Sequence, residues 1–277
     1  MEVLYQEVWD ILSNRQSGSV VLLNDLTKAF SFYSKRNNEG RQKELNELLN
    51  FLETGFANFP VILHFIKEFK EFISKNKEQS IQDFLCIYAK QWDEIPSKLA
   101  KNASSLIDFT NKTVLVQSHS GTILSFFEHQ RRHFNDIKII QMESRPVMEG
   151  REQAKLLVKL GFSVTFITDS AASRFFPEVD LVISGADRVC QNYFINKTGT
   201  YSLALLAQAF NKPFYLLSDS RKFYKDDSCI NMKEKAKDPK EIWKNPPERI
   251  HIKNYYFEPI PTSLVTAIIT EKGLHKT

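Results

Sequence analysis

The sequence has few of the residues that build disulfide frameworks or metal sites. It contains three cysteines in 277 residues, Cys86, Cys190 and Cys229. Their number is odd and no two of them have CxxC spacing, so we expect neither a disulfide framework nor a zinc site. This usage is typical of a reducing compartment, and we expect a cytoplasmic protein without a bound metal.

Long apolar runs and a strong net charge are also absent. No stretch approaches membrane-spanning length, and the opening MEVLYQEVWDIL is acidic and amphipathic, unlike a signal peptide. The net charge of +4 comes from 37 basic and 33 acidic residues, which is too mild and too evenly spread to favour nucleic acid. We therefore expect a globular protein with neither a membrane nor nucleic acid as its direct partner.

The first 110 residues have helical periodicity and no strand alternation. Leu4, Val8 and Leu12 fall on one face of the first predicted helix. Further helices are expected from Val20, around 45–52, at about 60–75 and 80–92, and up to Phe109. We expect residues 1–110 to form a helical domain that packs on, or extends, the rest of the chain.

From Thr113 onward, short β-branched runs alternate with helical stretches of about 10–15 residues. This alternation predicts βαβ units and a parallel sheet in a second domain, 111–277. No Gly-x-Gly-x-x-Gly follows any of the runs, which disfavours a nicotinamide cofactor, and we expect no cofactor. The predicted strands are Thr113–Val116, Lys138–Gln141, Ser163–Thr168, Val179–Ser184 and Phe214–Ser218.

The last part of the chain is expected to leave the sheet and return to it. Residues Asp226–Arg249 are rich in Lys, Asp and Pro and predict a surface excursion. A strand is expected near His251–Phe257 and a final helix at Ser263–Thr270.

Polar residues follow the predicted strand Val179–Ser184. Asp187 lies in the turn after it, and Asn196 and Lys197 precede the next helix. Open α/β sheets bind ligands at the carboxyl ends of their strands, so these three residues are candidates for a ligand site. The alternative is a surface loop with ordinary solvated charges.

The turn after Thr113–Val116 has the composition of an anion site. Ser118, His119 and Ser120 precede Gly121, so backbone N–H groups and the following helix N-terminus are available to a phosphate. Alternatively, Ser118 or Ser120 is a simple helix cap, and His119 is a packed or solvent-exposed histidine.

Three other turns at this predicted edge are polar. Arg145 suits bidentate binding of phosphate or carboxylate, or else pairs with Glu143. Asp169 either faces a ligand or caps a helix, and Ser218–Phe223 forms the fifth turn. A doubly wound topology places all five turns around one crevice.

With these residues laid out, the second half resembles one superfamily. It contains the alpha, beta and delta subunits of translation initiation factor 2B and two isomerases, of methylthioribose-1-phosphate and ribose-1,5-bisphosphate. The resemblance implies an α/β fold, with an N-terminal helical domain, a Rossmann-like, doubly wound, mostly parallel sheet domain, and dimers or larger assemblies. The matching motifs are ESRPVMEGRE (143–152), ITDSAA (167–172), VDLVISGADRV (179–189), INKTGTYSLAL (195–205), NKPFYLLSDSRKF (211–223) and FEPIPTSLVTAIITEKG (257–273).

The resemblance also implies roles for individual residues. In the isomerases a cysteine after the first strand and an aspartate in the GAD motif are thought to move the proton between two sugar carbons. Asp187 matches that aspartate, and Asn196 and Lys197 match a substrate-contacting pair. The cysteine position falls on Ser118, and a hydroxyl is several pKa units less acidic than a thiol.

Two further matches differ from the isomerases. Glu149 occupies the place of a substrate-binding Gln in methylthioribose-1-phosphate isomerase. The Arg-Gly-Ala phosphate loop of the isomerases falls near Ser17, Gly18 and Ser19, where its arginine is out of register with Arg15. Ser118 and the Glu-Gly-Arg run 149–151 resemble the initiation-factor branch, whereas Asp187, Arg188 and the Asn-Lys pair resemble the isomerases.

Three hypotheses follow. The first is a factor-2B-like protein, a homodimer or higher oligomer, that binds a phosphorylated ribose or nucleotide and has an initiation factor 2 homologue as a further candidate partner. The second is an active aldose–ketose isomerase in which Asp187 acts as acid and base with help from Ser118 or His119. The third is a structural interaction subunit with a vestigial pocket.

Overall fold

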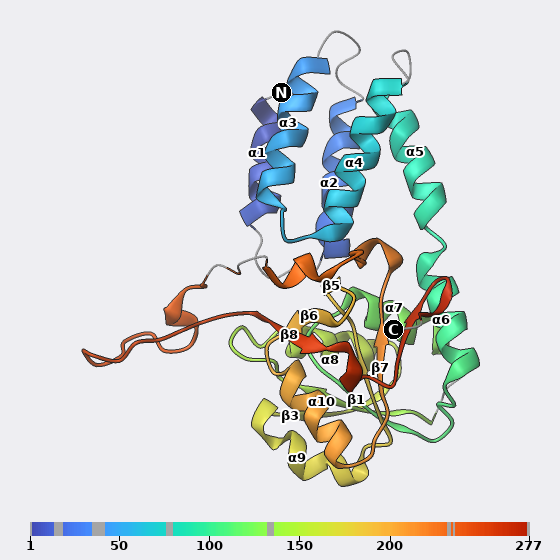
Figure 1. Ribbon diagram of the computed structural model, residues 1–277, viewed down its shortest axis with the longest axis vertical. Helices are drawn as coiled ribbons and strands as arrows, with labels where there is room; N and C mark the ends of the chain where they lie inside the picture. Colours follow the sequence, from blue (N-terminus) through green and yellow to red (C-terminus); the bar gives the residue numbers. More distant parts are fainter. Residues whose placement is uncertain are drawn as a thin grey trace. The chain divides into compact units, whose positions relative to one another are not determined.

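The computed structural model describes residues 2–13, 19–34, 42–75, 80–131, 136–231, 234 and 236–275. Contacts between backbone positions divide the chain into two compact units, Met1–Glu94 and Ile95–Thr277 (Figure 1). Each unit has its own hydrophobic core, and each is described by itself. The predicted division at residue 110 remains a prediction.

The first unit consists of helices, as the sequence predicts. Its core is aromatic: the rings of Phe69 and Phe84 stack with centroids 4.3 Å apart, and Phe30 meets Phe69 edge-on at 5.3 Å. Ser80 caps the last helix and forms a capping box with Asp83, which satisfies N–H groups that the helix itself leaves unpaired. The helices are α1 (Glu2–Ser13), α2 (Ser19–Ser34), α3 (Gln42–Gly55), α4 (Pro60–Lys75) and α5 (Ile81–Trp92).

The second unit is built on a seven-stranded sheet in the order β10-β9-β7-β4-β1-β2-β3. Every neighbouring pair is parallel except β9 and β10. The chain runs outward from β1 in one direction through β2 and β3, and in the other through β4 and β7, which is the doubly wound arrangement predicted. The strands are β1 (Thr113–Val116), β2 (Lys138–Met142), β3 (Ser163–Ile167), β4 (Leu181–Ser184), β7 (Phe214–Leu217), β9 (Ala267–Thr270) and β10 (Gly273–His275).

Helices cover both faces of this sheet. Side chains alternate along each strand, so Val114 and Val116 enter one core while Leu115 enters the other. Each buried aliphatic or aromatic side chain stabilises the unit by about 1.5–3 kcal/mol relative to exposure. On the first face lie α6 (Ile95–Leu106), α7 (Gly121–Gln130) and α8 (Gly150–Lys159); on the second lie α9 (Ala172–Phe175) and α10 (Thr200–Ala209).

A small second sheet follows β4 and was not predicted. It joins β5 (Arg188–Val189), β6 (Tyr193–Lys197) and β8 (Phe257–Pro261) in antiparallel order. Asn196 and Lys197 therefore lie on a strand, at its carboxyl end, where the backbone holds them more rigidly than a loop would.

The predictions for the C-terminal region were wrong in two places. A strand was expected at His251–Phe257, but most of that segment is irregular. The strand β8 begins at Phe257, six residues after the expected start. The expected helix at Ser263–Thr270 is instead a 3-10 turn followed by β9. Val265, Ile268 and Ile269 have helical spacing, but β-branched residues and pairing with β7 favour a strand.

The cysteine pattern was also misread. Cys190 and Cys229 form a disulfide, with their Cα atoms 6.2 Å apart, although no disulfide framework was expected. The bond ties the end of β5 to the 3-10 turn Asp227–Asn231, at the start of the predicted excursion. Residues 242–249 of that excursion, and the two that follow, are all exposed and run out from the unit before the chain returns to β8 (Figure 1). None of the described helices is long and apolar enough to cross a membrane.

Candidate functional site

The candidate site begins at the carboxyl end of β1, where the strand order reverses. Ser118 has a positive φ of 64°, a conformation that is uncommon for residues other than glycine. Two bonds hold it there: its N–H donates to Ser144 Oγ at 2.7 Å, and its carbonyl accepts from Gln141 Nε2 at 3.1 Å. The backbone thus fixes the direction of the Ser118 side chain.

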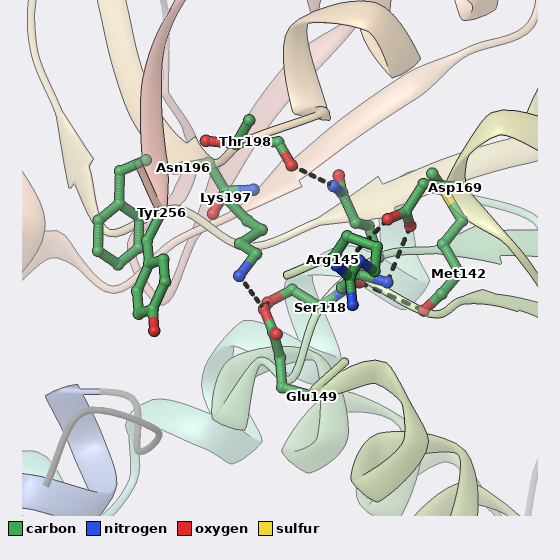
Figure 2. Close-up of polar contacts among 12 residues, drawn as sticks. Ser118, Met142, Arg145, Glu149, Asp169, Asn196, Lys197, Thr198 and Tyr256 are labelled. Atoms are coloured by element: carbon green, nitrogen blue, oxygen red, sulfur yellow. Dashed lines mark hydrogen bonds and ion pairs between the residues drawn. The ribbon is translucent and has the colours of Figure 1, made fainter. Parts of the chain in front are cut away.

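Glu149 connects Ser118 with Lys197 (Figure 2). Its Oε1 atom accepts from Ser118 Oγ at 2.8 Å and from Lys197 Nζ at 2.8 Å. The side chains of Lys197 and Glu149 are only 5% and 12% exposed. The Oε2 atom of Glu149 is buried and has no hydrogen-bond partner within the described part of the chain. Sequence reasoning selected all three residues, and the structure brings them together.

Tyr256 lies over the same lysine. Lys197 Nζ is 4.7 Å from the centroid of the Tyr256 ring, a cation–π contact. The Tyr256 hydroxyl donates to Glu241 Oε2 at 2.6 Å, which links this ring to the excursion. Tyr256 was not among the predicted site residues, since nothing in its sequence surroundings distinguishes it from a core aromatic.

The turn after β2 contains a cis peptide bond between Arg145 and Pro146. Asp169, from the turn after β3, accepts from the N–H groups of Ser144 and Arg145 at 2.8 and 2.7 Å. The Arg145 guanidinium donates to the carbonyl oxygens of Glu241 and Ile242, both at 3.4 Å. Asp169 therefore fixes the backbone at Ser144 and Arg145, and Ser144 fixes Ser118. The position of Asp169 in the sequence did not reveal this role.

The N-terminus of α7 retains open backbone donors. Ser120 is the N-cap, and its Oγ accepts from Ile123 N–H at 3.4 Å, as the capping alternative predicted. Its own N–H donates to Gln153 Oε1 at 2.8 Å. Within the described residues no acceptor is found for the N–H groups of Gly121 and Thr122. These donors, at the positive end of the helix dipole, suit an anion.

The two other helix N-termini at this edge are already occupied. At α10, the N–H groups of Gly199 and Tyr201 both donate to Glu258 Oε1, at 2.8 and 2.9 Å. At α8, the N–H groups of Gly150 and Arg151 donate to backbone carbonyls of the preceding turn. Among these three helices, the anion-binding potential therefore remains at α7.

A close contact joins this turn to the one that carries Asp187. A Cβ atom added to Gly185 would lie 2.5 Å from Ser120 Oγ, so a larger residue there would displace the Ser120 hydroxyl. Asp187, two residues on, is partly exposed, and its N–H donates to Ile195 O at 2.9 Å. The turns after β1 and β4 thus lie against each other at the switch point of the sheet, the position where open α/β sheets bind ligands.

Asp187 lies among positive charges. Burial raises the pKa of its carboxyl group, and the charges of Lys222, Arg188 and Lys197 oppose that rise without cancelling it. Lys222, unlike the half-buried Asp187, is fully buried, and its Nζ donates to Ala186 O at 2.7 Å. A carboxyl group with a raised pKa can exchange a proton nearer neutrality than an exposed aspartate can.

The remaining predicted residues have diverse surroundings. Asn196 is buried, and its amide donates to Ser184 Oγ and Thr200 Oγ1 at 2.9 and 3.0 Å, joining β4, β6 and α10.

Burial lowers the pKa of His119, and the charges of Glu149 and Glu152 oppose that change. Ser19 is buried at the start of α2, in the first unit. Ser17 and Gly18 lie outside the described residues. Ligand contacts by all of these residues remain predictions.

A helical unit followed by a doubly wound α/β unit, with polar turns at the switch point of its sheet, defines a class of α/β proteins. Within that class, the sequence pattern of the Initiation factor 2 subunit family matches residues 16–277. The chain belongs to this family.

Curated relatives carry two kinds of name. Methylthioribose-1-phosphate isomerase of Bacillus licheniformis is 35% identical over 64% of this chain and 53% of its own length. Ribose 1,5-bisphosphate isomerase of Methanocaldococcus jannaschii is 32% identical over 58% and 54%. Translation initiation factor eIF2B subunit alpha of Dictyostelium discoideum is 26% identical over 85% and 80%. The chain spans about half the length of the two isomerases.

Solved structures agree on the fold. The Pyrococcus horikoshii translation initiation factor eIF-2B has a TM-score of 0.81 at 22% identity, covering 99% of this chain and 97% of that one. The 5-methylthioribose 1-phosphate isomerase of the same organism has a TM-score of 0.80 at 19% identity, covering 98% and 83%. At these identities the likeness extends to the fold alone.

Proposed function

We propose that this protein is a factor-2B-like protein that binds a phosphorylated ribose or nucleotide in the crevice between the β1 and β4 turns. The observation that carries the proposal is the pair of open N–H groups at Gly121 and Thr122, in the turn whose Ser118 forms a half-buried group with Glu149 and Lys197. The first can hold a phosphate and the second can hold a polar ring. The names of two relatives, isomerases of ribose phosphates, support this class of ligand.

Binding without isomerisation is the reading that the site favours. Aldose–ketose isomerisation needs a base that removes a proton from carbon, and the thiol position of the isomerases is Ser118 here. The Ser118 hydroxyl donates to Glu149 Oε1 and is hardly ionised near neutrality. We therefore propose a regulatory, translation-related role in the cytoplasm, as a homodimer or higher oligomer, with an initiation factor 2 homologue as candidate partner.

One observation favours the second candidate, an active isomerase. Burial raises the pKa of the Asp187 carboxyl group, which makes acid and base catalysis by this group chemically feasible. Following ketose formation by NMR from ribose-1,5-bisphosphate and methylthioribose-1-phosphate separates the two candidates. Turnover that disappears in Asp187→Asn would replace the binding proposal with the isomerase.

Calorimetry tests the phosphate site directly. Ribose 5-phosphate, ribose-1,5-bisphosphate and AMP are titrated into the wild type, Gly121→Pro and Gly121→Ala. Proline is well tolerated at the first position of a helix, and the extended Ser120 backbone suits a following proline. Gly121→Pro removes one N–H donor and should weaken binding about tenfold, whereas Gly121→Ala keeps the donor and controls for the added carbon. Absence of binding to every compound leaves the structural interaction subunit.

A further inference from the structure

The ring of Tyr256 lies where it can control the direction of the Lys197 side chain. The ring centroid is 4.7 Å from Lys197 Nζ, and Figure 2 shows the lysine running beside the ring toward Glu149. We propose that Tyr256 is a positioning residue of the candidate site, which holds the Lys197 ammonium group in one direction by a cation–π contact. The inference rests on the proposed function where it concerns a ligand, and on the chain alone where it concerns the lysine.

Lys197 needs a second contact, because its ion pair alone leaves the ammonium group several positions. A lysine side chain has a flexible four-carbon stem and three N–H donors. Among the described residues, Glu149 Oε1 is the one hydrogen-bond acceptor of Lys197 Nζ, at 2.8 Å, so two N–H groups remain for a ligand. An ammonium group that tilts about a single contact would present these two donors in many directions.

Burial strengthens the contact between the lysine and the ring. Lys197 is 4% exposed and Tyr256 is 5% exposed. The negative face of an aromatic ring attracts a cation, and this attraction grows when water is excluded from both partners. Such a contact changes an equilibrium constant by about tenfold or more. That is enough to favour one direction of the ammonium group over the others.

The ring itself is held at both ends. Tyr256 directly precedes β8, and its N–H donates to Glu234 Oε1 at 2.9 Å. At the other end its hydroxyl donates to Glu241 Oε2 at 2.6 Å, and the same oxygen accepts from Asn254 Nδ2 at 2.8 Å. The ring therefore cannot move away from Lys197 without breaking a hydrogen bond to the excursion.

The alternative is that Tyr256 only fills space, as a core aromatic does. A second ammonium group provides an internal comparison, since Lys237 Nζ is 5.1 Å from the centroid of the same ring. Lys237 belongs to the excursion and is only half-buried, so its contact with the ring should be the weaker of the two. Removing the charge of each lysine in turn separates the buried contact from the more exposed one.

A double-mutant cycle tests the contact without any ligand. Residue 256 is changed to phenylalanine or to 3,4,5-trifluorophenylalanine, each combined with the natural lysines, Lys197→Met or Lys237→Met. Fluorine withdraws electrons from the ring face and changes the ring size little. In urea denaturation, fluorination should lower the folding equilibrium constant about tenfold with both lysines present and with Lys237→Met, but less than about threefold with Lys197→Met. An equal effect of fluorination with and without the Lys197 charge would overturn the inference and leave the proposed function intact.

Calorimetry with ribose 5-phosphate tests what the contact does for the site. Tyr256→Phe keeps the ring face and should bind within about threefold of the wild type, whereas the trifluorophenylalanine variant and Tyr256→Leu should bind about tenfold more weakly. Tyr255→Leu is the matched control, because that neighbouring tyrosine is 45% exposed, and it should keep the wild-type affinity.

The two measurements fail in different ways. A trifluorophenylalanine variant that binds as tightly as Tyr256→Phe would overturn the positioning role. Absence of binding to the wild type would overturn the proposed function, and the double-mutant cycle would still decide whether Tyr256 holds Lys197. Circular dichroism verifies that each variant is folded.

Discussion

At the scale of single residues, the buried charges of the second unit depend on partners close in sequence. Asp219 is 3% exposed, and Arg221 donates to both its carboxylate oxygens through Nε at 3.0 Å, with a further contact from Nη2. Burial alone would raise the pKa of Asp219, but the hydrogen bonds and charge of Arg221 bring it below its usual value. The folded structure therefore favours the ionised form of the Asp219 carboxylate over its protonated form.

We expect Asp219→Asn to destabilise the protein by about 3 kcal/mol at pH 7, because it leaves Arg221 buried without its countercharge. A lowered carboxyl pKa contributes stability above the usual aspartate value of about 3.9, and this contribution is lost as the pH falls through the lower, folded-state value. The difference in free energy of unfolding between Asp219→Asn and the wild type should therefore become smaller below about pH 4. Urea denaturation at pH 7 and pH 3 measures this difference.

A matched control for that substitution lies on the surface of the first unit. Asp25 meets Lys28 at 3.5 Å with both side chains well exposed, so Asp25→Asn should change the free energy of unfolding by less than about 0.5 kcal/mol. An equal effect of the two substitutions would contradict the stabilising role of the buried pair.

His119 gives a second test by pH. Burial lowers its pKa, and the charges of Glu149 and Glu152 act in the opposite direction, so its ring should titrate below the usual value of about 6.5 in an NMR experiment. Since the unfolded chain then takes up the proton first, stability should fall as the pH drops below about 6.5. Glu152→Gln removes one opposing charge and should lower the midpoint further; a midpoint above 6.5 would contradict this environment.

The polar residues of the site were predictable from sequence to different degrees. Ser118, Glu149 and Lys197 stand beside strand ends or within a family motif, and the structure brings them together. Asp169 and Glu258 were not assigned their contacts, because each acts on backbone N–H groups of a distant segment. Such contacts depend on strand order and register, which a single sequence does not contain.

At the scale of elements, glycines set how closely the turns pack. The added Cβ at Gly185 would meet Ser120 Oγ at 2.5 Å but Ser120 Cβ at 3.4 Å. The conflict thus involves one hydroxyl group, and it is the contact that joins the β4 turn to the β1 turn.

Gly185→Ala should therefore cost about 1–3 kcal/mol through overcrowding. Ser120→Ala alone should cost about 1 kcal/mol through loss of the α7 cap. In the double variant the new methyl group occupies the space of the missing hydroxyl. The double variant should therefore be destabilised by less than the sum of the two single variants, by more than about 0.5 kcal/mol. Denaturation of all four proteins measures this coupling, and strict additivity would contradict the contact.

The elements themselves show where periodicity suffices. The helices from α1 to α6 and the parallel strands from β1 to β4 and β7 were predicted within a few residues, because each has a long apolar face or a short β-branched run. The strands β5, β6 and β8 were not, since they lie outside the βαβ units and depend on antiparallel partners, and β5 has only two residues. The strand β9 was taken for a helix, because the apolar residues Val265, Ile268 and Ile269 fit a helical period although the segment pairs as a strand.

At the scale of the whole molecule, the two compact units raise the question of where an independent domain begins. Among the described residues, no apolar core combines residues from both sides of Glu94. The buried residues of one core end at Tyr88, and those of the others begin at Leu99. Helix α6 lies between residue 94 and the predicted boundary at 110. Its Leu99, Ala100 and Ala103 belong to the core of the sheet, and Asn102 Nδ2 donates to Thr270 O at 2.9 Å.

Two fragments, 95–277 and 111–277, distinguish the boundaries. The shorter one lacks α6, Ile107 and Phe109, all packed against the sheet. Losing three large buried side chains and two alanines removes roughly 6–9 kcal/mol of burial, which is comparable to the whole stability of a typical domain, about 5–15 kcal/mol. We expect 95–277 to unfold cooperatively with urea and 111–277 to have weak near-ultraviolet circular dichroism. Equal stability of the two fragments would support the boundary at 110, and with it an α6 that extends the helical domain.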